Sequence, residues 1–180
     1  MKKKFNVNQI VFIGIMSAII CILGPFSFPI GIVPISFTNL AIYFVLYALG
    51  MKNGTISYCI YLLIGFVGIP VFSGFTSGPA KLLGPTGGYL IGFIFMALIA
   101  GVFIDKFIAK RYLCITGMVL GTAVCYTIGT VWLSFQANMS IGSALVAGVI
   151  PFIAGDLIKI LLAAFLGPQI RSRLNKSKLL

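Results

Sequence analysis

The chain has 180 residues, of which 60% are hydrophobic and 8% are charged. Soluble domains carry about 25% charged residues, so this composition excludes an ordinary soluble domain and predicts an all-α integral membrane protein. The formal net charge of +11 does not indicate a nucleic-acid partner. The basic residues flank apolar runs and are not interleaved with aromatic and polar residues on a soluble face.

Residues with catalytic or metal-binding side chains are scarce. The sequence contains two acidic residues, Asp105 and Asp156, and no His, and its four Cys stand singly in apolar stretches. Acid–base pairs and clusters of metal ligands are therefore not expected. We predict a protein that is not an enzyme and that holds no metal or cofactor, with the Cys residues buried as free thiols.

Apolar runs predict six transmembrane helices in a single domain, residues 1–180. The first helix covers residues 8–23 and is not cleaved. An apolar stretch broken by prolines follows, up to Ser36. Because proline disrupts helices and irregular backbone at membrane depth must be covered by protein, we expect this stretch to fold over the outer mouth. The next two helices cover residues 37–50 and 55–68, with a turn at residues 52–54.

The remaining elements follow a long connection at residues 70–85 that is rich in Gly and Pro. Loops of that length are usually functional or disordered, and we expect this one to act as a mobile lid. Helices are predicted at residues 86–104 and 112–134, and a short helix at residues 143–149. The last membrane helix begins at Pro151, which suits the first helical turn because its missing N–H costs nothing there.

The distribution of positive charge predicts the orientation in the membrane. Of the 13 Lys and Arg residues, all but Lys81 and Lys159 lie at the chain ends or in the connections at residues 51–54 and 105–111. A six-helix topology places all of these segments on one side, and basic residues favour the cytoplasmic side and anionic lipid. We therefore expect a multi-pass protein of the cell membrane with both termini in the cytoplasm.

Two ionisable residues, Asp156 and Lys159, interrupt the apolar run from Pro151 to Gly167. A charge at the bilayer centre costs roughly 2.5–3.5 kcal/mol on insertion scales, so such residues usually face a cavity and are functional. Three positions apart on a helix, they share one face. A carboxylate beside an ammonium can hold a polar, neutral group from two sides, so we predict a ligand site here. The alternative is a structural ion pair.

The segment GPTGGY, residues 84–89, stands at the start of a predicted helix. Backbone N–H groups at such a position can hold a ligand, so Gly84, Thr86, Gly87 and Tyr89 are candidate binding residues. No Gly-Lys-Ser/Thr follows, which excludes a phosphate-binding P-loop. Lys81, the one basic residue expected outside, is a candidate contact for an anionic group. The alternatives are ordinary turn glycines and a solvated Lys.

Three stretches together resemble the BioY family, the biotin-binding S components of energy-coupling factor (ECF) transporters. They are PVF at residues 70–72, LLGPTGGYLIGF at residues 82–93 and PFIAGDLIK at residues 151–159. The resemblance extends over nearly the whole chain. It implies a six-helix S-component fold that binds biotin near the outer face. It also implies partnership with the transmembrane coupling protein EcfT and a pair of cytoplasmic ATPases.

The resemblance also implies roles for residues in the first two helices. The family pattern PxTxQTL aligns with PISFTNL at residues 34–40, where Thr38 stands at the position of the pattern's Gln. Thr38 and Asn39 are therefore candidate pocket residues. S components resembling this chain carry small residues at four-residue spacing on the first helix, and Gly14 and Ala18 fit that pattern. Small residues let helices approach closely, so these two are predicted to dock EcfT and not to touch biotin.

Biotin suits the candidate residues chemically. Its ureido ring offers N–H donors to Asp156 and a carbonyl acceptor to Lys159, while Lys81 and the loop N–H groups can meet its anionic tail; the reverse assignment of the two ends is also open. The chain has no nucleotide motif, which agrees with dependence on ATPase partners. One alternative is a stand-alone facilitator or carrier for a small carboxylate or vitamin. Another is a structural scaffold whose buried pair binds nothing.

Overall fold

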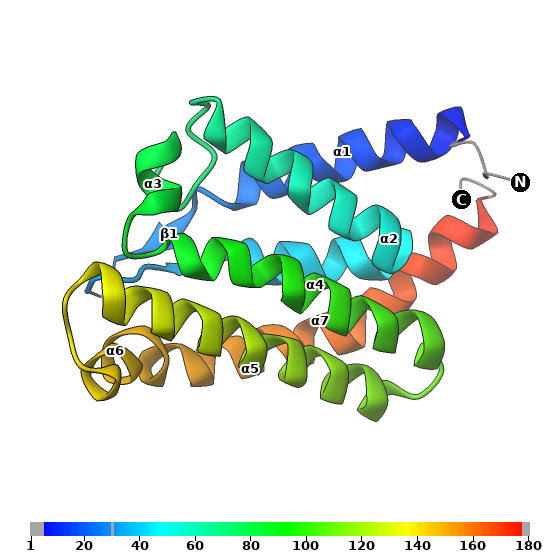
Figure 1. Cartoon of the computed structure of the whole chain (residues 1–180). Helices are drawn as coiled ribbons and strands as arrows, with labels where there is room; N and C mark the ends of the chain where they lie inside the picture. The colour runs from blue at the N-terminus through cyan, green and yellow to red at the C-terminus, as the bar shows by residue number, and fades with distance from the viewer. Residues whose placement is uncertain (1–5, 30, 178–180) are drawn as a thin grey trace, which may run out of the picture.

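The predicted helices are present in the structure, a computed structural model that describes residues 6–29 and 31–177. Lys2, Lys3, Lys4 and Lys178, which the orientation argument uses, lie outside the described residues. The elements are α1 Val7–Leu23, β1 Ser27–Phe28, β2 Ile35–Ser36, α2 Thr38–Phe66, α3 Pro79–Leu83, α4 Gly87–Phe107, α5 Arg111–Gln136, α6 Ile141–Gly148 and α7 Ile150–Lys176. The long helices pack side by side as a bundle (Figure 1).

The element α2 is a helical hairpin with its reversal at Gly50. The backbone there is non-helical, with φ 77° and ψ 177°, a conformation that favours glycine. A Cβ placed on Gly54 would lie 3.3 Å from the Cα of Leu46, whereas eight residues of straight helix span about 12 Å. The two predicted helices are therefore both present, but the predicted turn at residues 52–54 is wrong, because those residues are already helical.

Asp105, to which the sequence assigns no role, holds this reversal in place. Its Oδ2 accepts a hydrogen bond of 2.8 Å from the backbone N–H of Met51, the first residue after Gly50. Its Oδ1 accepts a hydrogen bond of 2.8 Å from Arg171 on α7. The first N–H groups of a helix have no partner within the helix, and a side chain of α4 supplies one here. Asp105 therefore joins α4, α7 and the second arm of α2.

Replacing Asp105 is expected to lower the melting temperature of the detergent-solubilised protein. Asp105→Ala removes both hydrogen bonds, and we expect a loss of about 1 kcal/mol, because the ion pair is partly exposed to solvent. Asp105→Asn keeps an acceptor for Met51 and removes only the charge opposite Arg171, so it should lose less. An equal melting temperature for the Ala variant and the wild type would show that the reversal at Gly50 does not need this support.

Glycines bring α4 and α5 into close contact. A Cβ on Gly92 of α4 would lie 3.1 Å from the Cα of Cys125, and a Cβ on Gly121 of α5 would lie 3.2 Å from the Cα of Met96. Helices in lipid associate through packing, so small residues at their contacts allow the backbones to approach. This antiparallel pair forms one wall of the bundle (Figure 1), and the cavity described below opens beside it.

The two ends of the bundle differ in charge. The start of α1, the reversal in α2, the α4–α5 turn and the end of α7 lie at one end, while β1, α3 and α6 lie at the other (Figure 1). At the first end, the described residues include basic side chains beside the reversal in α2, in the α4–α5 turn and at the end of α7. Lys81 lies on α3, at the other end. Among the described residues, α4, α5 and α7 are long and apolar enough to cross a membrane. The count of six crossings and the cytoplasmic termini stay predictions.

Candidate ligand-binding site

A cavity opens at the end of the bundle that carries β1, α3 and α6, and it contains about 640 Å³ of unfilled space, including its open mouth. Residues from β2, α2, α4, α5, α6 and α7 line it together with the segment before β2 and Ser73. The strands β1 and β2 pair antiparallel, with Ser27 opposite Ser36. Val33 and Pro34 of the proline-rich stretch are part of the lining, and the position of the stretch over the outer mouth stays a prediction.

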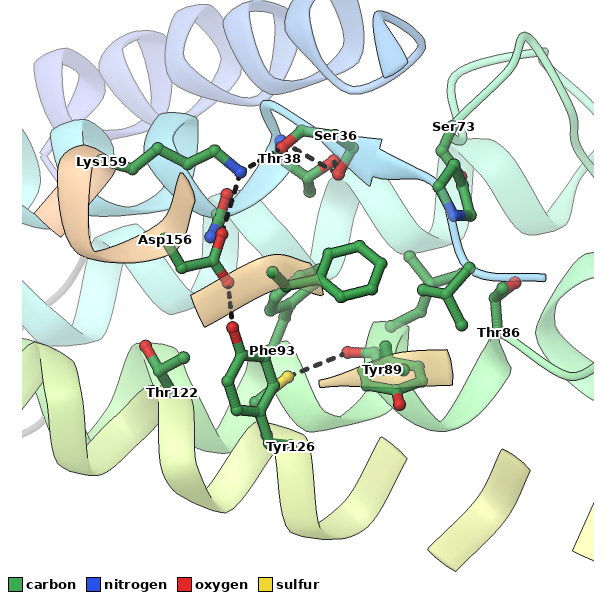
Figure 2. Close-up of a pocket in the computed structure, with 17 residues that line it drawn as sticks. Ser36, Thr38, Ser73, Thr86, Tyr89, Phe93, Thr122, Tyr126, Asp156 and Lys159 are labelled. Atoms are coloured by element: carbon green, nitrogen blue, oxygen red, sulfur yellow. Dashed lines mark hydrogen bonds and ion pairs between the residues drawn. The ribbon is translucent and has the colours of Figure 1, made fainter. Parts of the chain in front are cut away.

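Asp156 and Lys159 lie on the wall of this cavity (Figure 2). Each is only 8% exposed, and the Lys159 ammonium donates to Asp156 Oδ1 at 3.0 Å. Lys159 also donates to the backbone oxygen of Ser36 at 2.8 Å, which ties α7 to the strand β2. On the other side, Tyr126 Oη donates to Asp156 Oδ2 at 2.6 Å. The buried charges are therefore paired and hydrogen-bonded, as burial requires.

The rest of the cavity wall is largely apolar and aromatic. Phe93 and Leu90 line it from α4, and Phe152 lines it from α7. Tyr89 packs where Gly129 and Gly148 have no side chains, since a Cβ on Gly129 would collide with its ring and a Cβ on Gly148 would collide with its hydroxyl. An apolar wall with a few convergent polar groups is the usual construction of a small-molecule site.

The structure brings some of the predicted site residues together and leaves others outside. Thr38, Asn39, Thr86 and Tyr89 line the same cavity as Asp156 and Lys159. Ser36 Oγ donates to Thr38 Oγ1 at 3.0 Å. Contacts with a ligand remain predictions for all of these residues.

Lys81, Gly84 and Gly87 do not line the cavity. The Gly84 carbonyl accepts from Trp132 Nε1 at 2.9 Å and from the N–H of Gly87 at 3.0 Å. A Cβ on Gly87 would collide with the carbonyl of Leu82. The two glycines thus shape the corner between α3 and α4, and their predicted ligand contacts stay predictions, as does that of Lys81.

Several cavity residues were not predicted from the sequence. Tyr126 and Thr122 come from α5, and Ser36 contributes a backbone carbonyl. Tyr126 is separated from Asp156 by 30 residues, so no local spacing relates the two. The one signal available was general: a buried charge needs partners, and an apolar helix that carries Tyr and Thr residues can supply them.

The connection at residues 70–85 is partly fastened to the bundle. Phe72 is fully buried, and its ring packs edge-on against Tyr61 with 5.5 Å between centroids. The N–H of Gly74 donates to the carbonyl of Pro25 at 2.9 Å. Phe75 beyond it is exposed and has a positive φ of 57°. Within this connection, Ser73 lines the cavity. Movement of the segment as a lid stays a prediction.

Gly14 and Ala18 lie on the exposed face of α1. A Cβ placed on Gly14 would have no neighbour within 4 Å, and neither residue lines the cavity. The opposite face of α1 is joined to α2, where Ser17 Oγ donates to the carbonyl of Ser57 at 3.1 Å. The two small residues are therefore exposed and separate from the cavity.

A bundle of apolar helices with a buried ion pair in a cavity at one end defines an integral membrane protein that binds a small ligand. Residues 1–176 match the BioY family. The chain belongs to the BioY family.

Named relatives and a solved structure agree with that assignment. The chain is 36% identical to the biotin transporter BioY2 of Lactococcus lactis subsp. cremoris over 159 residues, covering 88% of this chain and 87% of that protein. It is 35% identical to the biotin transporter BioY of Thermotoga maritima over 164 residues, covering 91% and 96%. A crystal structure of the S-component for biotin from an ECF-type ABC transporter superposes with a TM-score of 0.85 at 32% identity, covering 96% and 95% of the two chains.

These findings confirm the main predictions from the sequence. The chain has the S-component fold and is a multi-pass membrane protein. The predicted resemblance to BioY is confirmed, and the relatives are named as transporters, not as enzymes.

Proposed function

We propose that this chain is the biotin-binding subunit, or S component, of an ECF-type importer, and that it captures biotin at the outer side of the membrane. The observation that carries the proposal is the buried Asp156–Lys159 pair in the cavity wall, in a chain whose relatives are named biotin transporters. An intramembrane charge is by default a sign of function, and here the two charges face a space that can hold a ligand.

The geometry suits the two ends of the ureido group. Asp156 accepts one hydrogen bond at each oxygen, and a carboxylate has about four acceptor positions, so it can also accept from a ureido N–H. Lys159 has three N–H donors and donates two hydrogen bonds among the described residues, one to Asp156 and one to Ser36. The third donor can meet the ureido oxygen. Both contacts are charge-assisted and therefore stronger than neutral hydrogen bonds.

The remaining parts of biotin match the rest of the site. The bicyclic ring and the pentanoate chain are apolar and suit the wall formed by Phe93, Leu90 and Phe152. The anionic tail is then directed toward the mouth, and Lys81 on α3 belongs to the same end of the bundle. Partial burial lowers the pKa of the Lys81 ammonium, and a nearby carboxylate would stabilise its charged form.

The proposed partners are EcfT and a pair of cytoplasmic ATPases. The sequence contains no nucleotide-binding motif, so in this proposal the energy of ATP hydrolysis is supplied by other subunits. The similar protein of known structure is described as part of an ECF-type ABC transporter, which supports this proposal. The stand-alone facilitator is the second candidate, and it predicts uptake without ATPases.

Calorimetric titration of the detergent-purified chain with biotin tests the proposed ligand, and we expect saturable binding. Lipoate is the matched control, because it has the same pentanoate chain and a sulfur ring but no ureido group, and we expect much weaker binding. Absence of heat with biotin would contradict the proposal. Purification of the tagged chain from its native membrane should also recover EcfT and ATPases. Biotin uptake without these partners would favour the facilitator.

A further inference from the structure

Tyr126 contacts Asp156 across the boundary between α5 and α7. Its hydroxyl donates to Asp156 Oδ2 at 2.6 Å, while Lys159 occupies Oδ1 at 3.0 Å. Figure 2 shows the hydroxyl pointing directly at the carboxylate from the opposite helix. Hydroxyl-to-carboxylate bonds of about 2.5–2.7 Å are among the strong, charge-assisted class. The two bonds together fix the plane of the Asp156 carboxylate.

The carboxylate has a second space beside it. A nearly apolar groove lies on the other side of this contact, and Thr122, Tyr126 and Asp156 line both the groove and the ligand cavity. The other residues of the groove are apolar or small, namely Val119, Ala123, Ile153, Leu157 and Ile160. The three shared residues therefore separate the cavity from the groove. Without the hydroxyl of Tyr126, one carboxylate oxygen would lose its partner at this dividing wall.

We propose that Tyr126 is a positioning residue for biotin recognition: its hydroxyl holds the Asp156 carboxylate in the orientation that accepts the ureido N–H. The inference rests on the proposed function, because it assumes that biotin binds at Asp156. Binding is strongest when the acceptor is already oriented before the ligand arrives, since the cost of ordering it is then not taken from the binding free energy. Tyr126 lies on α5, and its hydrogen bond orients the Asp156 carboxylate from outside α7.

The test is calorimetric titration with biotin of four proteins: wild type, Tyr126→Phe, Asp156→Asn and the double variant. Tyr126→Phe keeps the ring and removes only the hydroxyl, and we expect its dissociation constant for biotin to rise up to about tenfold, as the cost of ordering one side chain on binding implies. The double variant should bind no more weakly than Asp156→Asn alone, because two residues that act through one contact are not additive.

A ligand comparison separates positioning from a general structural effect. Biotin methylated on a ureido nitrogen lacks one N–H donor, and wild-type protein should bind it more weakly than biotin. In Tyr126→Phe the ratio of the two dissociation constants should shrink, because the acceptor is no longer held in place. A mere loss of stability would leave this ratio unchanged.

Tyr58→Phe is the matched control variant. It removes the hydroxyl of another buried Tyr, which donates to the carbonyl of Leu90 at 2.8 Å, and Tyr58 does not line the cavity. We expect a lower melting temperature with biotin affinity within twofold of wild type. The inference would be overturned if Tyr126→Phe kept the wild-type affinity and ligand ratio, or if the losses in the double variant were additive. The proposed function would still stand in either case. A wild-type protein that fails to bind biotin would overturn the proposed function and the inference with it.

Discussion

Replacing Asp156 by Asn is expected to weaken biotin binding at least tenfold while the protein still inserts and folds. The substitution keeps the size of the side chain but replaces an ion by a neutral amide. Charge-assisted hydrogen bonds contribute about 1.5–3 kcal/mol, and each 1.4 kcal/mol corresponds to a factor of about ten in affinity. Because Lys159 would then be buried without its carboxylate partner, the loss can exceed that of a single ligand contact.

Calorimetric titration with biotin measures this effect, and the chain offers a matched control. The other acidic residue, Asp105, is outside the cavity lining. Asp105→Asn makes the same chemical change near Gly50 and Arg171, and its biotin affinity should stay within twofold of wild type. Unchanged affinity in purified, folded Asp156→Asn would show that the carboxylate is not a ligand group, and the ion pair would then be structural.

Replacing Ala18 by Trp is expected to abolish ATP-driven biotin uptake while biotin binding by the isolated chain is retained. Ala18 is exposed on α1 and does not line the cavity. In lipid, close approach of two helices depends on small residues at their contact, so a Trp at this position should hold the helices of EcfT and this chain apart. Uptake by whole cells, copurification with EcfT and calorimetric titration measure the three quantities.

The control for this variant is Leu120→Trp. Leu120 is 47% exposed on α5. The helices α5 and α1 lie on opposite sides of the bundle (Figure 1), so a Trp at position 120 should leave uptake near the wild-type rate. Normal uptake by Ala18→Trp would require another docking face. Loss of biotin binding by the isolated variant would show that Ala18 affects the pocket and not the partner contact.

The part of the candidate site that the sequence predicts is the part with a local signal. Asp156 and Lys159 are three residues apart in an apolar run, so the helix period alone places them on one face. A pair of charges in an apolar run is the usual basis for a functional hypothesis. The structure shows both in the wall of the cavity. The glycine-containing segment at residues 84–89 was a weaker signal for ligand-binding residues. Gly84 and Gly87 form the turn between α3 and α4 and do not line the cavity.

Contacts between distant segments could not be predicted in this way. The bond between Tyr126 and Asp156 joins residues 30 apart, and that between Lys159 and the Ser36 carbonyl joins residues 123 apart. The capping of Met51 by Asp105 is another such contact. It accompanies the chain reversal at Gly50, whereas the turn predicted from the sequence was at residues 52–54.

The sequence by itself determined the class of this protein, its apolar helices, its family and the two charged residues at the centre of the proposed site. These properties depend on composition, on helix period and on motifs, which are all local. The tertiary structure decided which groups satisfy those charges, which predicted residues reach the cavity and where α2 reverses. These outcomes depend on how whole helices pack, because a buried charge takes the partners that packing brings within hydrogen-bond distance, whatever their separation along the chain.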